Sequence, residues 1–542
     1  MPPGNGSDPA RRFDALVVGA GFAGLYALHR LRGLGLSVRV LEAGSGVGGT
    51  WYWNRYPGAR CDIESLDYSY SFSDELAREW EWTERYATQA EILRYAEHVA
   101  DRFELRRDIS FDTRVVSAVF DERASEWTLT TEAGDRLRAP FCVMATGCLS
   151  APLEPDFADR DAFSGELYYT NRWPHEPVDF TGKRVGVIGT GSSGIQAIPE
   201  IAKTAGSLSV FQRTPNFSFP ARNEPLSDEE QGAVKADYRG HRQRGIERGG
   251  GFGARWAPVL GPAADVPPGE QREALEERWE GGGLAVLSCF EDALANPEAN
   301  AVVAEFVREK IAGVVDDPET AALLSPDTMV GCKRPCLDTG YFETFNRPNV
   351  RLVDISEAPI ERLTPKGLVT DGVDHPLDVL VLATGFDAMT GALLRMDVRG
   401  RGGRRLADAW REGPRTYLGL AVHGFPNLFL VTGPGSPSVL SNMMAAIEQH
   451  VDWITGCIAH LRERGARSIE ATREAEAAWI EDVSELADAS IYPTCNSWYV
   501  GANVPGKPRV FMVYLGLAGY IERCNEIVAK GYEGFALSPG GA

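Results

Sequence analysis

The amino-acid sequence predicts an α/β fold with two strand–turn–helix–strand units, the second of which contains a helical insertion. Two of the observations behind this prediction are glycine-rich turns at residues 19–24 and 189–194. Each turn lies between an apolar run and a helical pattern. The third observation is the segment 221–330, which is rich in Glu, Arg and Ala and has mostly helical periodicity.

The first glycine-rich turn follows an apolar strand at residues 13–19 and precedes a second strand at residues 38–41. Glycines here allow a tight turn and a close approach of the backbone to a pyrophosphate, whose charge the helix N-terminus stabilises. The acid that ends the second strand can bind a ribose diol. A chance cluster of glycines is the competing interpretation, but the strand, the helix and the acid all stand at the expected spacing. The predicted binding residues are Gly19, Gly21, Gly24 and Glu42.

The second glycine-rich turn has the same context, but its second strand, at residues 208–211, ends in Gln-Arg-Thr without an acid. A carboxylate would repel a 2′-phosphate, whereas an arginine can pair with it through two hydrogen bonds. A solvated cation at a strand end is the competing interpretation. We therefore expect two Rossmann-like dinucleotide-binding domains, the first for FAD and the second for NADPH. The second is predicted to use Gly189, Gly191, Gly194, Arg213 and Thr214.

Apolar strands followed by Ala-Thr-Gly at residues 145–147 and 383–385 fit the chain crossings between two such domains. Further strands are expected at residues 350–353 and 379–382, after the helical segment. The predicted division is an FAD-binding domain from residues 1–150 and 385–542, an NADP-binding domain from 151–220 and 331–384, and a helical insertion at 221–330.

Charge and composition exclude several classes of partner. The net charge of −21 argues against nucleic acid and against an anionic membrane surface. No apolar run is long enough for a transmembrane helix, and residues 1–12 read as a short disordered lead rather than a secretory signal. The nine cysteines are scattered, and Cys332 and Cys336 lack a second ligand pair, so no metal site is expected. We expect a reduced, cytoplasmic protein that is a monomer.

Two dinucleotide-binding units in one chain imply that a nicotinamide reduces a flavin. No Cys-x4-Cys pair follows the first unit, which argues against a disulfide reductase. The electrons of the reduced flavin must then leave by another route, and O2 is the obvious acceptor.

Two longer segments carry a more specific pattern. Residues 48–62 read Gly-Gly-Thr-Trp-Tyr-Trp-Asn-Arg-Tyr-Pro-Gly-Ala-Arg-Cys-Asp, and residues 163–174 read Phe-Ser-Gly-Glu-Leu-Tyr-Tyr-Thr-Asn-Arg-Trp-Pro. Through them the chain resembles the type I Baeyer–Villiger monooxygenases, and the similarity runs from about residue 13 to residue 535. Within that family it is most similar to the branch that oxidises phenylacetone and steroids, and also similar to enzymes that oxidise cyclohexanone. Tyr169 stands where the family has His, and Leu517-Ala518 replaces the usual Gly and aromatic residue.

The resemblance implies that NADPH reduces FAD and that O2 then forms a flavin C4a-peroxide, which converts a ketone to an ester or lactone. Sulfoxidation follows from the same oxidant. Aromatic, cyclic or polycyclic ketones are the substrates that the resemblance favours. In this pattern Arg334 is the cation beside the flavin and Asp62 the carboxylate that holds it. Lys333 assists at the 2′-phosphate, and Thr50, Trp51 and Trp498 contact the cofactors. The residues expected to line the substrate pocket are Ser438, Val439, Leu440 and Met443.

Without the resemblance, the same residues have simpler interpretations. Asp62 could cap a helix, Trp498 could be a core aromatic, and the basic pair 333–334 could be solvated. Two other functions also stay open. One is a flavin monooxygenase that hydroxylates heteroatoms, which the Trp-Pro ending at residues 173–174 disfavours. The other is an electron transferase that needs a protein partner, for which the sequence shows no docking patch.

Overall fold

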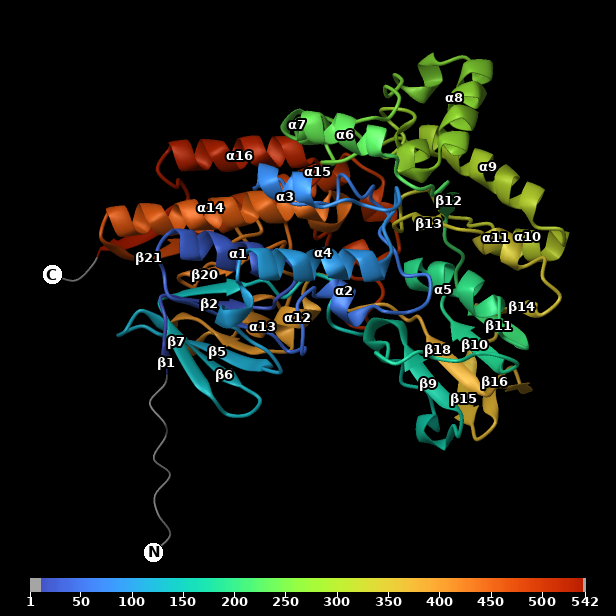
Figure 1. Cartoon of the computed structure of the whole chain (residues 1–542), viewed down its shortest axis with the longest axis horizontal. Coiled ribbons are helices and arrows are strands. Elements are labelled where there is room, and N and C mark those ends of the chain that lie inside the picture. Colours follow the sequence, from blue (N-terminus) through green and yellow to red (C-terminus); the bar gives the residue numbers. More distant parts are fainter. Residues whose placement is uncertain (1–10, 540–542) are drawn as a thin grey trace, which may run out of the picture.

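The computed structural model describes residues 11–539 and confirms the α/β class with two parallel sheets (Figure 1). All strands of the first sheet run parallel, and the strand before the first glycine turn lies at its centre. The last strand comes from the C-terminal third of the chain and pairs beside residues 141–144. In spatial order the strands are β4 (Ile109–Ser110), β3 (Val38–Leu41), β2 (Ala15–Val18), β8 (Phe141–Met144) and β20 (Leu428–Leu430).

Helices cover one face of this sheet, and a second sheet formed by residues 115–139 packs against the other. Both faces are therefore buried, which explains why its strands are continuous apolar runs. The helix after the first glycine turn, α1 (Phe22–Gly33), buries Leu25, Leu28 and Leu31 completely. It packs against α14 (Met443–Glu463), the longest helix among the described residues. Figure 1 shows α1 and α14 stacked above the sheet together with α4 (Gln89–Arg102) and α16 (Leu517–Ala529). The N-terminal and C-terminal parts of the chain therefore share one core.

The second parallel sheet repeats this arrangement around the second glycine turn. Its central strand precedes helix α5 (Ser192–Ala202). In both sheets the strand order reverses beside the glycine turn, and this reversal creates the crevice in which such folds bind ligands. In spatial order the strands are β14 (Val350–Asp354), β11 (Ser207–Gln212), β10 (Arg184–Ile188), β18 (Val379–Leu382) and β9 (Glu166–Tyr169).

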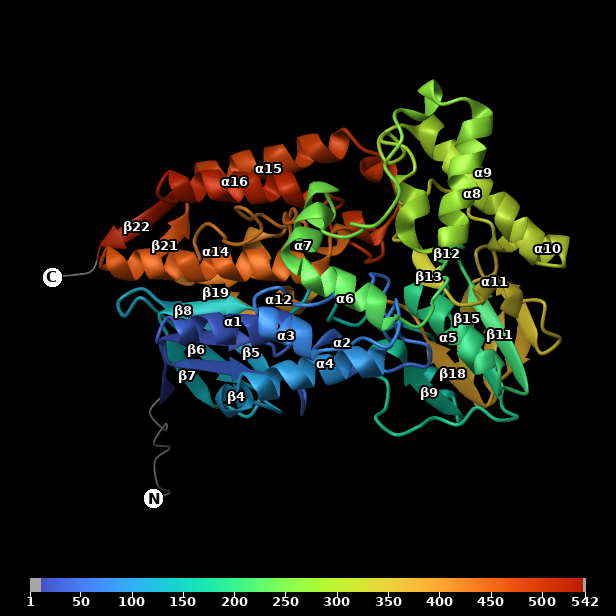
Figure 2. The ribbon, with the colours of Figure 1, turned by 45° about the horizontal axis from the view of Figure 1, so that its top comes forward.

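In the helix-rich segment between β11 and β14, the helices after residue 267 form a lobe above the second sheet, whereas those at residues 228–247 lie over the first unit beside α16 (Figures 1 and 2). Two short parallel strands, β12 (Ser218–Pro220) and β13 (Cys336–Asp338), bring the chain into the lobe and out of it. The predicted helical face at residues 301–312 is buried, because Val303, Phe306 and Ile311 are at most 3% exposed. The helices are α6 (Asp228–Ala236), α7 (Tyr238–Glu247), α8 (Pro268–Gly281), α9 (Pro297–Val314) and α10 (Pro318–Leu324).

Mixed and antiparallel sheets complete the fold. The largest is mixed, because its three central strands pair antiparallel and its two edge strands pair in parallel. In spatial order its strands are β1 (Arg11–Arg12), β7 (Arg136–Ala139), β6 (Glu126–Thr131), β5 (Val115–Asp121) and β19 (Asp397–Arg399). The expectation of a disordered lead is wrong for residues 11–12, which pair with β7, while residues 1–10 lie outside the described part. A three-stranded sheet packs on the second parallel sheet and contains β15 (Ile360–Thr364), β16 (Gly367–Thr370) and β17 (Val373–Pro376). Within residues 11–539, no helix has the length and apolar character to cross a membrane.

Candidate active site

The first glycine turn has the geometry that a pyrophosphate requires. Gly19 has φ +103°, a conformation that side chains rarely permit. A Cβ on Gly24 would lie 1.8 Å from the carbonyl oxygen of Gly19, so this position accepts only glycine. Helix α1 begins at this turn without a side-chain cap and without an acid in its first turn. Its first N–H groups are therefore free for an anion, and the residues present fit the pyrophosphate of FAD.

Glu42 lies beside this turn at the end of β3. Its carboxylate accepts hydrogen bonds from the backbone N–H of Ala20 at 2.6 Å and of Gly44 at 2.7 Å. Burial raises the pKa of Glu42, and these hydrogen bonds oppose that effect. Glu42 thus braces the glycine turn at the position where a ribose diol is expected.

The second glycine turn repeats the geometry. Gly189 has φ +107°, and a Cβ on Gly194 would lie 2.1 Å from the Gly189 carbonyl oxygen. The space that a Cβ on Gly191 would enter is open, and helix α5 starts there without a side-chain cap. The hydroxyl of Thr190 donates to the carbonyl oxygen of Thr214 at 3.1 Å, which ties the turn to the end of β11. This turn also fits a dinucleotide pyrophosphate.

Two cations meet beside the second turn. Arg213 is exposed and follows β11 directly. Lys333 comes from the segment after the helical insertion, and its pKa is lowered by burial and by the charge of Arg213. The fold therefore brings these two cations together from positions 120 residues apart. An anion between them would relieve their repulsion, as the 2′-phosphate of NADPH would.

Thr50 and Trp51 begin the short helix α2 (Thr50–Trp53), and Thr50 is exposed. Gly49, just before them, approaches the first glycine turn so closely that a Cβ on it would lie 2.8 Å from the Cα of Gly21. The indole N–H of Trp51 donates to the hydroxyl of Tyr68 at 3.1 Å. Both predicted cofactor residues therefore lie next to the first turn.

The Tyr-Pro-Gly part of the same segment docks on helix α5 of the second unit, a contact that the sequence did not reveal. The hydroxyl of Tyr56 donates to the side-chain oxygen of Gln196 at 2.9 Å. Gly58 has φ +80°, and a Cβ there would lie 2.3 Å from the backbone oxygen of Gln196. The segment thus positions the two dinucleotide units relative to each other.

Arg334 and Asp62 form a bidentate ion pair at this junction, as the sequence resemblance implied. Nε and Nη2 of Arg334 donate to the two oxygens of Asp62 at 2.6 and 2.8 Å. Nη1 of Arg334 donates to the backbone oxygen of Val439 in the predicted pocket loop. Burial alone would lower the pKa of Arg334, but the carboxylate of Asp62 raises it above its usual value. The guanidinium is therefore a fixed positive charge.

The predicted pocket residues gather in one apolar cluster beside Arg334. Val439 is buried in this cluster, and Leu440, Met443 and Trp498 pack against it. Ser438 is fully buried, and its hydroxyl lies 3.9 Å from the sulfur of Met389. The cluster supplies a water-poor wall beside the cation, which strengthens electrostatic interactions there.

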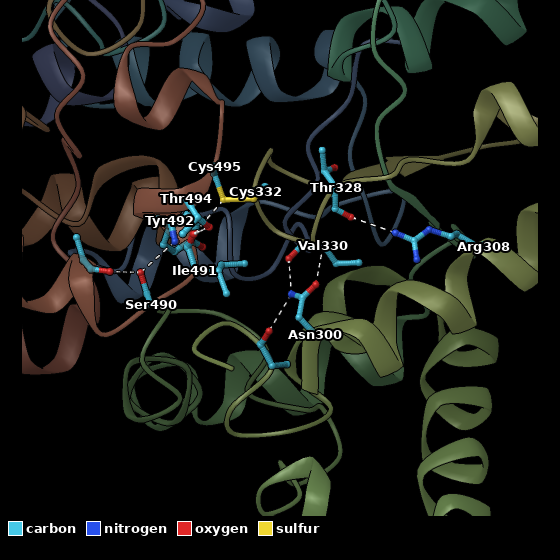
Figure 3. Close-up of a disulfide and its surroundings, with 12 residues drawn as sticks. Asn300, Arg308, Thr328, Val330, Cys332, Ser490, Ile491, Tyr492, Thr494 and Cys495 are labelled. Atoms are coloured by element: carbon cyan, nitrogen blue, oxygen red, sulfur yellow. Dashed lines mark hydrogen bonds between the residues drawn. A yellow bond between two sulfur atoms is a disulfide. The ribbon is translucent and has the colours of Figure 1, made fainter. Parts of the chain in front are cut away.

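A disulfide joins Cys332 to Cys495 within this cluster, so the expectation of fully reduced cysteines is wrong at this pair (Figure 3). The other seven cysteines are free and buried. The two bonded residues are separated by 163 positions, and neither belongs to a motif. No spacing rule could have paired them from the sequence.

Tyr169, the departure from the family pattern, ends strand β9. Its hydroxyl accepts a hydrogen bond from Arg160, and the guanidinium of Arg172 lies 4.8 Å from its ring centre. Glu154 pairs with both arginines. Tyr169 therefore contributes to a surface clamp between two arginines.

Comparison with known proteins assigns the family. A family profile described as "Pyridine nucleotide-disulphide oxidoreductase" matches residues 16–227. The chain is 46% identical to an acetone monooxygenase (methyl acetate-forming) of Gordonia sp. (strain TY-5), over 97% of this chain and 99% of that protein. It is 41% identical to a Baeyer–Villiger monooxygenase of Pseudooceanicola batsensis, over 96% and 95% of the two chains. The chain belongs to the Baeyer–Villiger monooxygenases. It is therefore an FAD-dependent enzyme that uses NADPH and O2.

Two further similarities bear on this family member. The solved structure of an oxidised steroid monooxygenase bound to NADP superimposes with a TM-score of 0.93 and 54% identity, over 98% of this chain and 100% of that one. A phenazine N-monooxygenase of Lysobacter antibioticus is 44% identical over 97% of each chain. Overall similarity therefore does not separate ketone oxidation from nitrogen oxidation, and the pocket must decide between them.

Proposed function

We propose that this Baeyer–Villiger monooxygenase oxidises aromatic, cyclic or polycyclic ketones to esters or lactones. The observation that carries the proposal is the ion pair of Arg334 and Asp62, which is tied to the Val439 carbonyl at the edge of the apolar cluster. The cluster presents flexible thioether side chains, among them Met329, Met389 and Met443. Methionines adapt to ligands of different shape, which favours a range of bulky ketones.

The cofactors have assigned positions in this proposal. The first unit, formed by residues 1–150 and 385–542, holds FAD. The second, formed by residues 151–220 and 331–384, holds NADPH, and residues 221–330 form the insertion. When bound, the reduced flavin activates O2 and supplies the oxygen atom that enters the carbon–carbon bond beside the carbonyl. Arg213 and Lys333 bind the 2′-phosphate, and Trp498 contacts the nicotinamide ribose.

The residues of this chain have three further tasks. Arg334 keeps a positive charge next to the reacting atoms and so stabilises negative charge that develops on oxygen. Asp62 fixes the orientation of the guanidinium through two hydrogen bonds. Val439, Leu440 and Met443 exclude water, which would otherwise promote release of hydrogen peroxide.

The test is a panel of substrates with FAD-loaded enzyme, NADPH and air, with products identified by mass. The panel contains a phenyl-substituted ketone, a monocyclic ketone, a steroid ketone and phenazine. We expect one oxygen atom to be added to at least one ketone, with an ester or lactone as product. NADPH consumption that gives only hydrogen peroxide with every ketone would exclude the proposal.

Nitrogen oxidation is the second candidate, because a relative named for phenazine N-oxidation is 44% identical. An aromatic N-oxide without any ester from the same panel would favour it. A monomer in the cytoplasm is also part of the proposal. Size-exclusion chromatography with light scattering tests the monomer.

A further inference from the structure

The disulfide connects two segments that carry different parts of the active site. Cys332 directly precedes Lys333 and Arg334, whereas Cys495 lies three residues before Trp498. Any relative movement of the two segments would separate the cation from the nicotinamide side of the site. The disulfide is thus a covalent link across the place where the cofactors and the ketone meet.

The Cys332 segment is fixed to the helical insertion. The side chain of Asn300 on α9 donates to the backbone oxygen of Val330 at 2.8 Å and accepts from its N–H at 2.9 Å. Arg308, also on α9, donates to the Pro326 carbonyl oxygen at 2.7 Å. These contacts hold the segment on one side of the disulfide independently of the sulfur bridge.

The Cys495 segment is held by contacts that are spread along its length. After α15 (Arg473–Asp488) the chain forms two short helical turns and then runs irregularly from residue 501 to residue 516. Lys507 binds Asp387 at 2.7 Å, and the N–H of Ile491 donates to the Leu294 carbonyl oxygen at 3.0 Å. Further along, the Asn503 side chain donates to the Phe386 carbonyl oxygen at 2.7 Å, and the N–H of Tyr514 donates to the Ser436 carbonyl oxygen at 3.0 Å. Between these contacts the segment has no regular secondary structure, and the disulfide adds a covalent restraint near its start.

A surface groove of about 350 Å³ reaches only one of the two sulfur-bearing residues. Cys495 lines it together with Asp488, Asn496, Arg509 and Phe511, whereas Cys332 does not. Both cysteines are otherwise buried, at 5% and 4% exposure. Because Cys495 forms part of the groove wall, we infer that a small thiol attacks this residue from the groove and that Cys332 is the leaving thiolate.

We propose that Cys332–Cys495 is a reversible thiol–disulfide site that controls the coupling of NADPH oxidation to substrate oxygenation. A thiolate attacks Sγ of Cys495, the S–S bond breaks, and Cys332 leaves as a thiolate beside two cationic residues. A second thiol then releases Cys495, so two thiols become one disulfide and the protein gains two thiols. In the reverse direction, hydrogen peroxide oxidises the two cysteines to the disulfide and becomes two water molecules.

The reduced state loses the covalent link but keeps the ion pair of Arg334 and Asp62. Its 489–516 segment opens more often and admits water, so more NADPH ends in hydrogen peroxide. Since peroxide also closes the bridge, an uncoupled enzyme of this kind restores its own closed state.

The first experiment tests the chemistry without any ketone. A non-reduced digest of the holoenzyme should contain a linked peptide pair with Cys332 and Cys495. Alkylation under denaturing conditions should modify seven cysteines before reduction and all nine afterwards. In the native state, the Cys495 thiol of Cys332→Ser should react with a chromogenic disulfide at least about tenfold faster than the Cys332 thiol of Cys495→Ser, because thiol reactivity follows access. The seven other thiols are buried and common to both variants. Nine thiols in protein exposed to peroxide, or equal reactivity in the two variants, would overturn the proposal.

The second experiment tests the consequence. One sample of wild-type holoenzyme keeps the disulfide, and a second is reduced with a dithiol. For each sample we measure the rate of limited proteolysis within residues 489–516 and the amount of oxygenated product formed per NADPH. We expect reduction to raise cleavage and to lower coupling, each about threefold, which corresponds to local opening, and peroxide treatment to reverse both changes. The double variant Cys332→Ser/Cys495→Ser should stay at the reduced values, and Cys457→Ala on α14 should respond like wild type.

Equal proteolysis in both redox states would show that the bridge does not control the segment and would refute the proposal. If proteolysis changes with the redox state but the oxygenated product per NADPH does not, the claim that the disulfide controls coupling is refuted. Reversible reduction of the wild-type protein keeps the test valid if the double variant folds poorly. A wild-type enzyme that oxygenates no substrate in either state would count against the proposed function, while thiol counts and proteolysis would still test the disulfide.

Discussion

The dependence of Arg334 on Asp62 yields the most quantitative prediction. Asp62→Ala removes both oxygens that receive the guanidinium at 2.6 and 2.8 Å. The Val439 carbonyl oxygen would then remain as a hydrogen-bond acceptor for the Arg334 guanidinium. Asp62→Asn is the matched change, because it keeps one acceptor oxygen at nearly the same place and removes only the charge and the second acceptor.

The expected loss can be estimated from the geometry. Two unit charges 2.8 Å apart attract each other with about 6 kcal/mol at an effective dielectric constant of about 20. The side chains are 23% and 21% exposed, so solvent screens part of this attraction and desolvation offsets another part. A net loss of about 3 kcal/mol is typical when one partner of a buried pair is removed. If the same free energy is lost from transition-state stabilisation because the guanidinium is no longer held in place, the rate of ester formation drops about 100-fold. For Asp62→Asn we expect about a tenfold drop.

The assay is the initial rate of ester formation per bound FAD, measured with saturating NADPH. FAD content and NADPH affinity serve as controls for folding. Glu470→Ala, which removes a distant ion pair with Arg401 at 2.6 Å, is the control variant and should retain the wild-type rate. Wild-type rates in both Asp62 variants would refute the claim that Asp62 positions Arg334.

Arg213→Ala should raise KM for NADPH about 30-fold and leave KM for NADH nearly unchanged, because a charged hydrogen bond to the phosphate contributes about 2 kcal/mol. Equal effects on both KM values would show that Arg213 does not bind the 2′-phosphate. Tyr169→Phe should increase the hydrogen peroxide released per NADPH about threefold, since Arg160 loses its hydrogen-bond acceptor. The wild type should form ester with Tyr169 in place, and ester formation by Tyr169→His alone would contradict this. Burial raises the pKa of Asp338 from 3.8 to about 6, so its ionisation destabilises the fold as pH rises from about 4 to 6. The melting temperature of Asp338→Asn should therefore rise relative to wild type from pH 4 to pH 6 and keep a constant offset above about pH 7. An offset that does not change between pH 4 and pH 6 would contradict the raised pKa.

Individual strands and turns could be predicted from the sequence because neighbouring residues determine their conformation. Strand β3 at residues 38–41, strand β18 at residues 379–382 and both glycine turns depend on apolar runs and on glycine conformations that neighbouring residues specify. The pairing of Lys333 with Arg213 followed partly from the missing acid after β11 and partly from the family resemblance. Such features need no knowledge of long-range contacts.

The rest depends on contacts between distant residues, which periodicity cannot encode. Asp62 and Arg334 are 272 positions apart, and only the resemblance to a family connected them. The docking of Tyr56 on Gln196 and the bridge between Cys332 and Cys495 lacked even that signal. Residues 11–12 were expected to be disordered as the end of a lead rich in Pro, Gly, Ser and Asp, but backbone pairing with β7 does not require apolar side chains.

The most direct test of the central claim uses O2 labelled with heavy oxygen. FAD-loaded enzyme is incubated with NADPH and a ketone that the panel identifies, and the product and the hydrogen peroxide are quantified. We expect an ester or lactone with one heavy oxygen atom per NADPH in the wild type. In Arg334→Ala we expect continued NADPH oxidation with hydrogen peroxide as the product. Unlabelled ester, or labelled ester at the wild-type rate in Arg334→Ala, would contradict the account.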